Sequence, residues 1–258
     1  MIAVRVLVFG AGGRMGATVC EAVDADGGLE LAAGVDPGAP GQRDVTDSID
    51  IVASAAEVDP AAVDVAVDFT VAAAARENLA WCAAHGVHAV VGTSGLDPDD
   101  YERCREAFTA SNCLIAPNFA IGAVLMMRFA ELAAPFFPTA EIIELHHDNK
   151  VDAPSGTAMQ TARAMAAASG DWAPDPTQDE VLPGARGGKG PGGIPVHSVR
   201  LRGLVAHQQV MLGTAGETLT IRHDSMDRVS FMPGVLLACK AIADYPGVTI
   251  GLDTYLQL

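Results

Sequence analysis

The run V-L-V-F-G-A-G-G-R-M-G, from Val6 to Gly16, decides the fold of this chain. Its first four residues are apolar and favour a buried strand, and its glycines then allow a tight turn into a helix. The free N–H groups at such a helix start attract a phosphate. Gly10, Gly13 and Gly16 follow a G-x-x-G-x-x-G spacing rather than the strict G-x-G-x-x-G of dinucleotide-binding folds, so the loop alone also fits an ordinary tight turn.

A carboxylate at Asp36 strengthens the dinucleotide interpretation. It ends a second apolar run about 20 residues past the glycine loop, where dinucleotide-binding folds place an acid that accepts hydrogen bonds from the ribose hydroxyls. An acid there repels a 2′-phosphate, and the next residue is Pro37 rather than an arginine. We therefore expect NADH to be preferred, with NADPH still used because Arg14 can contact a phosphate. The alternative is a solvated aspartate at a strand end.

Strands and helices alternate through the first half of the chain. Apolar runs predict strands over 3–9, 29–35, 63–69, 87–91 and 114–116, and helices after residue 13, over 72–85 and from 98 to about 110. Asp97 followed by Pro98 is typical of a helix start. This alternation predicts an α/β fold, a Rossmann-like doubly wound parallel sheet with helices on both faces.

The pattern changes after Phe119. We expect a helix through Val124 and Met127, a strand over 140–146, a helix from Ser155, a mobile Gly/Pro-rich loop over 170–195, strands over 196–201, 208–212 and 218–223, a helix over 234–243 and a strand over 248–252. The last two strands before that helix are joined by a glycine turn and should pair antiparallel. The sequence thus predicts a dinucleotide-binding domain over 1–118, to which 228–258 returns, and a second α+β domain with a mixed or antiparallel sheet over 119–227, for substrate binding and oligomer contacts.

The charge balance excludes whole classes of partner. Sixteen basic and 32 acidic residues give a net charge of −16, whereas nucleic acids and anionic membranes need clustered Lys and Arg. No apolar stretch is long enough to span a bilayer, and the strand that begins near residue 3 leaves no room for a signal peptide. The five cysteines are scattered without a Cys-x-x-Cys pair, which indicates reduced thiols and a cytoplasmic protein.

Two later loops follow the expected ends of parallel strands, where doubly wound folds bind ligands. They are Gly92-Thr93-Ser94 and Ala116-Pro117-Asn118-Phe119. Their small residues and amide suit the ribose and carboxamide of a nicotinamide, although each is ordinary loop chemistry by itself.

The stretch E-L-H-H-D-N-K-V-D-A-P-S-G-T-A, from Glu144 to Ala158, carries the chemistry. Two adjacent histidines end a strand, so their side chains start on opposite faces, and a lysine follows. Ser155 can cap a helix whose first N–H groups form a site for a carboxylate or phosphate. An imidazole, a cation and an anion site are the parts that a small dianionic substrate needs.

Other uses of these residues fit less well. The paired histidines lack further ligands for zinc, so no metal is expected, and Ser155 lacks the context of a nucleophile. The remaining histidines at 85, 88, 197, 207 and 223 are expected to be structural or solvated.

Several motifs together resemble one family. The chain is similar along nearly its whole length to the 4-hydroxy-tetrahydrodipicolinate reductases, long called dihydrodipicolinate reductases, through G-A-G-G-R-M-G, D-F-T (68–70), V-V-G-T-S-G, A-P-N-F-A-I-G and the His–Lys segment. The resemblance implies reduction of a cyclic imine dicarboxylate by NADH or NADPH, without a metal, in the diaminopimelate route to lysine. It also implies a homotetramer joined through the sheet of the second domain.

The same resemblance implies roles for individual residues. His146 and Lys150 match the catalytic pair, and His147, Gly156 and Thr157 match the substrate contacts. The cofactor contacts are matched by Gly10, Ala11, Gly12, Gly13, Arg14, Met15, Asp36, Gly92, Thr93, Ser94, Ala116, Pro117, Asn118 and Phe119. Two positions depart from the family pattern: Ser94 replaces a threonine, and Asn149, to which we assign no role, stands where many members carry a third histidine.

Two other functions share part of this evidence. A different nicotinamide-dependent reductase of a small anion would share the cofactor half, although a semialdehyde dehydrogenase would need a cysteine nucleophile that is not evident. A dinucleotide-sensing protein without chemistry would need a partner surface or a basic module, and neither is evident.

Overall fold

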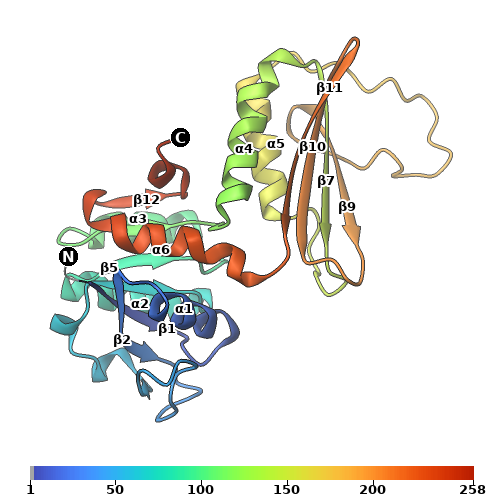
Figure 1. The fold of residues 1–258 in the computed structure, drawn as a ribbon. Coiled ribbons are helices and arrows are strands. Elements are labelled where there is room, and N and C mark those ends of the chain that lie inside the picture. Colours follow the sequence, from blue (N-terminus) through green and yellow to red (C-terminus); the bar gives the residue numbers. More distant parts are fainter. Residues whose placement is uncertain (1–2) are drawn as a thin grey trace. The chain divides into compact units, whose positions relative to one another are not determined.

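A computed structural model describes residues 3–258, which form two compact units (Figure 1). The first unit comprises the chain up to Ala120 together with Arg228–Leu258, and the second comprises Ile121–Asp227.

The first unit is built on a seven-stranded sheet in the order β12-β6-β5-β4-β1-β2-β3. Its strands are β1 (Val4–Phe9), β2 (Leu29–Val35), β3 (Ile51–Val52), β4 (Val65–Asp68), β5 (His88–Val91), β6 (Cys113–Ile115) and β12 (Val248–Ile250). Every pairing is parallel. The strand order reverses between β1 and β4, and ligands of such folds bind beyond the carboxyl ends of the strands at this point.

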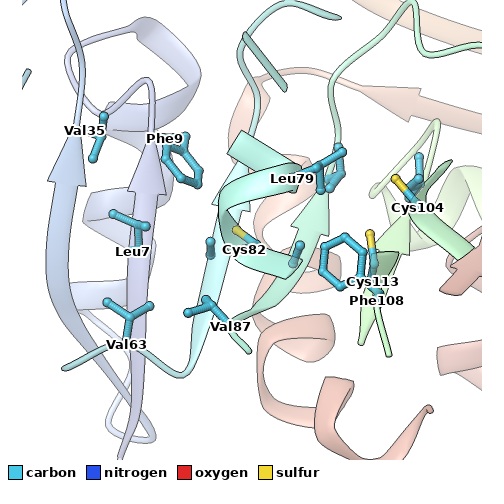
Figure 2. Packing of buried hydrophobic residues seen from close by; sticks show 14 residues of the cluster. Leu7, Phe9, Val35, Val63, Leu79, Cys82, Val87, Cys104, Phe108 and Cys113 are labelled. Atoms are coloured by element: carbon cyan, nitrogen blue, oxygen red, sulfur yellow. The ribbon is translucent and has the colours of Figure 1, made fainter. Parts of the chain in front are cut away.

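Helices pack on both faces of this sheet. They are α1 (Arg14–Asp24), α2 (Ala72–His85), α3 (Pro98–Ala107) and α6 (Met232–Ala241), of which α1 contacts α6 and α2 contacts α3. Alternate residues of β1 serve the two faces, because Leu7 and Phe9 join the α2–α3 core whereas Val6 and Val8 are equally buried on the other side. Figure 2 shows the α2–α3 core, with Leu79 and Cys82 packed over the strands. The predicted doubly wound parallel sheet is confirmed.

The second unit contains a five-stranded mixed sheet in the order β11-β10-β7-β9-β8. Its strands are β7 (Thr139–His146), β8 (Gly188–Lys189), β9 (Pro195–Arg200), β10 (Ala206–Thr214) and β11 (Glu217–Ser225). Only β7 and β9 pair in parallel among these strands, and the expected antiparallel pair is β10 and β11. Helices α4 (Ile121–Ala133) and α5 (Gly156–Ala168) lie side by side on one face (Figure 1).

The core of the second unit follows from two periodicities. Ala158, Ala162 and Met165 recur at helical spacing along α5, and alternate residues of β7, Ala140 and Ile142, face them. The next residue on that face of β7 is Glu144, followed by His146. A strand with a buried apolar face therefore carries a carboxylate and an imidazole toward the same side.

Some predicted boundaries are wrong. The helix expected to reach residue 110 ends at Ala107, because Phe108 turns into the core and is 4% exposed. The Gly/Pro-rich segment 170–195 is not a loop throughout, since β8 pairs with β9 and a 3-10 turn spans Pro191–Gly193. The two-residue strands β3 and β8 have no apolar run long enough to predict them.

All five cysteines are free and buried. Among the described residues, no helix has the length and apolar character needed to cross a membrane.

Candidate active site

The glycine loop lies between β1 and α1 as predicted. Gly10 has a φ of +72°, which favours glycine, and its N–H donates to the Val35 carbonyl at 2.7 Å. A Cβ at Gly16 would lie 2.0 Å from the Gly10 carbonyl oxygen, so only glycine lets α1 approach the loop this closely. Gly13 precedes the helix and offers no side-chain cap. The N–H groups of the first turn therefore remain suited to an anion.

Asp36 is held in place by two backbone N–H groups. Its Oδ2 accepts from Gly12 at 3.1 Å and its Oδ1 accepts from Gly38 at 2.8 Å. The side chain stands at the end of β2 and is half-buried. This geometry fixes a carboxylate beside the glycine loop, which is where a ribose acceptor is needed.

A large cavity adjoins both features. It has a volume of about 850 Å³, is confined to the first unit and falls in the size range of cofactor sites. Its lining includes five of the predicted cofactor residues, namely Gly10, Gly13, Arg14, Met15 and Asp36. A glycine cradle, an uncapped helix start, a fixed carboxylate and a cavity of this size together fit a nicotinamide dinucleotide.

Sequence reasoning missed part of this lining. The cavity also includes Ser54 and its neighbours after β3, Asn78 and Trp81 of α2, and Arg228. The short strand β3 gave no signal for the first group, and the others come from elements whose periodicity shows burial but not which ligand they face.

Asp68 has a structural role that the sequence analysis did not assign. It is 2% exposed at the end of β4 and accepts the Thr70 hydroxyl at 2.7 Å, the Thr93 hydroxyl at 2.7 Å and the Asn78 amide at 2.7 Å. A buried carboxylate with three side-chain donors ties the loops after β4 and β5 to α2. In the sequence it directly ends a buried strand and begins the D-F-T motif of the family resemblance, but neither feature predicts these partners.

The two loops predicted for the nicotinamide end lie at the carboxyl ends of β5 and β6, but they do not line the cavity. Thr93 and Phe119 are buried, the first against Asp68 and the second against the Phe69 ring at a centroid distance of 5.5 Å. Gly92 lies under the same ring, because a Cβ there would be 2.0 Å from Phe69 Cε1. The side chains of Thr93 and Phe119 are used in packing within the protein. Any contact between these buried residues and a cofactor must therefore come from their backbone atoms. Ala11 and Gly12 also do not line the cavity.

The His–Lys segment follows β7 in the second unit. His146 is the last residue of the strand, and its Nδ1 lies 2.5 Å from Glu144 Oε2. His147, the residue after the strand, is exposed. Lys150 is half-buried, and its Nζ donates to both carboxylate oxygens of Asp152 at 2.8 and 2.9 Å. The lysine thus carries an acidic partner that the sequence analysis did not consider.

Ser155 caps the start of α5 as predicted. Its side chain accepts from the Ala158 N–H at 3.2 Å. The helix opens at Gly156, where a Cβ would meet nothing within 4 Å. There is therefore open space beside the first residue of α5, and a helix start of this kind suits a carboxylate.

Glu144 and Arg200 complete the surroundings of His146. Glu144 is 0% exposed and accepts from Arg200 Nη1 at 2.9 Å and Nη2 at 2.8 Å. The sequence analysis missed both residues, although the alternation of Ala140, Ile142, Glu144 and His146 places the acid on the buried face.

The two titratable groups have shifted pKa values. Burial lowers the pKa of His146, Lys150 and Arg200 add to that effect, and Glu144 opposes it, so the net pKa lies below the ordinary value. Burial opposes ionisation of Glu144, but hydrogen bonds from Arg200, Ser198 and His146 outweigh it and hold its pKa below the ordinary value. Glu144 is therefore an anion at neutral pH, and His146 is largely neutral when no substrate is bound.

The other histidines have structural partners. His85 Nδ1 lies 2.8 Å from the Trp81 carbonyl, His88 accepts from the Asn112 N–H at 2.9 Å, and His197 and His207 each pair with a carboxylate at 2.7 Å. His223 lies against Gly122 of α4. Within residues 3–258, no group of three or more His, Cys, Asp or Glu side chains is arranged to hold a metal ion.

Comparison with known proteins agrees with this geometry. The family models described as dihydrodipicolinate reductase, N-terminus, and dihydrodipicolinate reductase, C-terminus, match residues 4–119 and 122–256. The 4-hydroxy-tetrahydrodipicolinate reductase of Cutibacterium acnes is 51% identical over 262 residues, which cover 99% of each chain. The Mycobacterium ulcerans protein of the same name is 50% identical over 258 residues, covering 98% of this chain and 99% of its own.

A solved structure gives the same result. The dipicolinate-bound dihydrodipicolinate reductase from Paenisporosarcina sp. TG-14 is 37% identical, with a TM-score of 0.86 over 98% of this chain and 99% of that one. The resemblance inferred from the motifs is confirmed, and the chain belongs to the dihydrodipicolinate reductase family.

Proposed function

We propose that this protein reduces 4-hydroxy-tetrahydrodipicolinate to tetrahydrodipicolinate with NAD(P)H, in the diaminopimelate route to lysine. Relatives that carry this enzyme name align over nearly the whole chain. The observation that carries the proposal is the end of β7, where a buried carboxylate holds His146, Lys150 follows, and the open start of α5 supplies N–H groups.

The substrate is a small dianion. The Paenisporosarcina relative is described with dipicolinate, a ring with two carboxylates. In this chain the N–H groups of Gly156 and Thr157, with the exposed imidazole of His147, bind one substrate carboxylate. Such local capture is necessary because the net charge of −16 repels anions at long range.

The 4-hydroxyl group leaves as water, which gives a conjugated cyclic imine dicarboxylate. The reaction then adds a hydride and a proton to this ring. Bound NAD(P)H supplies the hydride. Lys150 Nζ stabilises the negative charge that then develops on the ring, after the substrate replaces Asp152 as its anionic partner. His146 holds the proton at Nε2, because Nδ1 is engaged by Glu144. A bound dianion raises the low pKa of His146 and so favours the protonated imidazole that the step requires.

The first unit holds the cofactor. Gly10 to Met15 contact the pyrophosphate and Asp36 the adenine ribose, while the loops at 92–94 and 116–119 contact the nicotinamide end. The half-buried Asp36 carboxylate disfavours a 2′-phosphate, so NADH is preferred, and Arg14 in the same cavity keeps NADPH usable.

The assembly is a homotetramer in the cytoplasm, with no nucleic acid or membrane partner. The sheet face opposite α4 and α5 supports this assembly, because it carries Ile143, Leu145 and Met211, all partly exposed.

The decisive experiment follows NADH oxidation by the purified protein with enzymatically generated precursor of tetrahydrodipicolinate. We expect turnover that depends on the precursor and that dipicolinate inhibits competitively. The matched control omits the precursor but keeps the generating enzymes. Precursor-independent oxidation, or none at all, would contradict the proposal.

A further inference from the structure

The buried carboxylate of Glu144 forms hydrogen bonds with three separate segments of the second unit. Its Oε2 lies 2.5 Å from His146 Nδ1 and 2.9 Å from Arg200 Nη1. Its Oε1 accepts from Arg200 Nη2 at 2.8 Å and from the Ser155 N–H at 3.2 Å. One buried carboxylate thus joins the end of β7, the end of β9 and the start of α5.

Arg200 extends these contacts to the lysine. Its Nη2 also donates to the Asp152 carbonyl at 2.7 Å, and Asp152 is the residue whose carboxylate holds Lys150 Nζ. On the sheet, Arg200 of β9 lies directly opposite His146 of β7 in register. The Glu144–Arg200 pair therefore contacts both flanks of the segment that carries the proposed catalytic residues.

We infer that Glu144 and Arg200 are positioning residues, which fix the Nδ1–H tautomer of His146 and hold it in register with Lys150 and the start of α5. This inference rests on the proposed function for its effect on catalysis. The tautomer itself follows from the contacts alone.

The tautomer of His146 follows from the hydrogen-bonding capacity of its partner. An ionised carboxylate only accepts hydrogen bonds, so the short contact requires the proton of neutral His146 to be on Nδ1. Its Nε2 is then left with the lone pair that takes up and returns a proton. Arg200 supplies the opposite charge and two N–H donors, which keep the fully buried Glu144 ionised.

A second glutamate on β7, Glu141, has the same kinds of partner as Glu144. On the opposite face of β7, Glu141 pairs with His197 Nε2 at 2.7 Å and with Arg186 Nη2 at 2.5 Å. It repeats the chemistry of a glutamate between a histidine and an arginine, but it lies on the face away from the proposed site. Glu141→Gln is therefore a control for Glu144→Gln.

The first test is nitrogen NMR of 15N-histidine-labelled full-length protein, with the His146 signals assigned from His146→Gln. Above the pKa of His146, the wild-type protein should show the Nδ1–H tautomer at this residue. In Glu144→Gln, the side-chain amide can donate to Nδ1, and the Nε2–H tautomer should gain population. Glu141→Gln should leave the His146 signals unchanged. An Nε2–H tautomer in the wild-type protein overturns the inference, and this measurement needs no variant of Glu144 to fold.

The second test is the pH profile of kcat/KM. The charged groups that face His146 are Glu144 of β7, Arg200 of β9 and Lys150, and the facing residue of β10 is the uncharged Ala206. Removing Glu144 removes the only one of these charges that raises the pKa of His146, so the limb due to His146 should move to lower pH. We expect kcat to fall by about 10²-fold, the low end of what positioned acid–base catalysis contributes.

The outcomes separate positioning from mere stability. A lower melting temperature for Glu144→Gln with wild-type tautomer, kcat and pH profile overturns the inference. Absence of turnover in the wild-type protein contradicts the proposed function instead, and the tautomer measurement then still tests the inference because it does not use turnover.

Discussion

At the scale of single residues, Asp68 and Glu144 are buried carboxylates whose oxygens are used by donors from other segments. Asp68 accepts from Thr93, 25 residues away in the chain, and Glu144 accepts from Arg200, 56 residues away. Each acid costs free energy to bury unless such partners reach it. Both therefore fix loops that carry the proposed site.

His146 and Lys150 should affect turnover and leave cofactor binding intact. His146→Gln and Lys150→Ala should each lower kcat by about 10²- to 10⁴-fold, the range for acid–base groups. NADH affinity, measured by fluorescence titration, should change little, because the cofactor residues belong to the other unit. His197→Gln, which alters a histidine paired with Glu141, serves as control. Near-normal turnover in both test variants would remove their assigned roles.

Asp36 should set the cofactor preference. Asp36→Asn removes the charge that repels a 2′-phosphate, so kcat/KM for NADH should fall about tenfold, the loss of one hydrogen bond to a charged group, while the ratio of NADPH to NADH use rises. Asp47→Asn, an equal change of charge at an exposed carboxylate, should leave the ratio unchanged. A wild-type enzyme with a large NADPH preference contradicts the assignment.

The site was only partly predictable, because the sequence shows the local context of each residue but not its distant hydrogen-bond partners. His146, Ser155 and Gly10 were predictable from local rules, since a strand end, a helix cap and a tight turn are set within a few residues. Glu144 and Asp68 were not, because an acid on a buried face has no meaning until a distant donor such as Arg200 is placed beside it. The Lys150–Asp152 contact lies between these extremes. The two residues are close in sequence, but the sequence analysis considered the lysine without its acidic neighbour.

At the scale of elements, the longer apolar strands were predicted well and the two-residue edge strands β3 and β8 were not. β1 is buried on both faces from Val6 to Phe9, so these four residues are apolar without interruption, as in other strands of parallel sheets. The two-residue strands β3 and β8 are defined by their pairing with a neighbouring strand, which their own residues do not predict.

The contact between α1 and the glycine loop should be sensitive to one methyl group. Gly16→Ala places a Cβ against the Gly10 carbonyl, so the helix must shift and both NADH affinity and the free energy of unfolding should fall. Gly27→Ala, where a Cβ meets nothing within 4 Å, is the control. Calorimetric titration with NADH and urea unfolding measure the two effects, and equal behaviour of the variants would refute the close-packing argument.

The start of α3 should make stability depend on pH. Asp97 and Asp100 form a capping box, and the Arg76 guanidinium beside Asp100 holds the pKa of that carboxyl well below its usual range. A carboxyl with a lowered folded pKa stabilises the protein above its unfolded pKa of about 3.9, and this contribution is lost as the pH falls through the folded value.

Asp100→Asn should therefore lower the free energy of unfolding by about 1–2 kcal/mol at pH 7, as other lost caps do. The deficit relative to the wild-type protein should shrink in strong acid. Urea unfolding at several pH values measures it, with the exposed Asp99→Asn in the same turn as control. A deficit that does not vary with pH would show that the charge of Asp100 is not responsible.

At the scale of the whole molecule, the proposed tetramer can be tested by its mass. Sedimentation equilibrium should give four times the 26.6-kDa chain mass. Ile143→Glu puts a charge on the sheet face opposite α4 and α5 and should lower the mass, because burying that charge in an interface is costly. Ala215→Glu, at the exposed turn between β10 and β11, should not. A monomeric wild-type protein contradicts the tetramer.

The burial of every cysteine has a consequence for how the protein meets oxidants and alkylating reagents. Cys20 and Cys239 are 0% and 1% exposed, and burial raises the pKa of each thiol to about 12. Protonated sulfur shielded from solvent reacts slowly, so modification must wait until the surrounding structure opens. The rate at which a thiol-reactive dye labels the native protein therefore measures how often its first unit opens spontaneously.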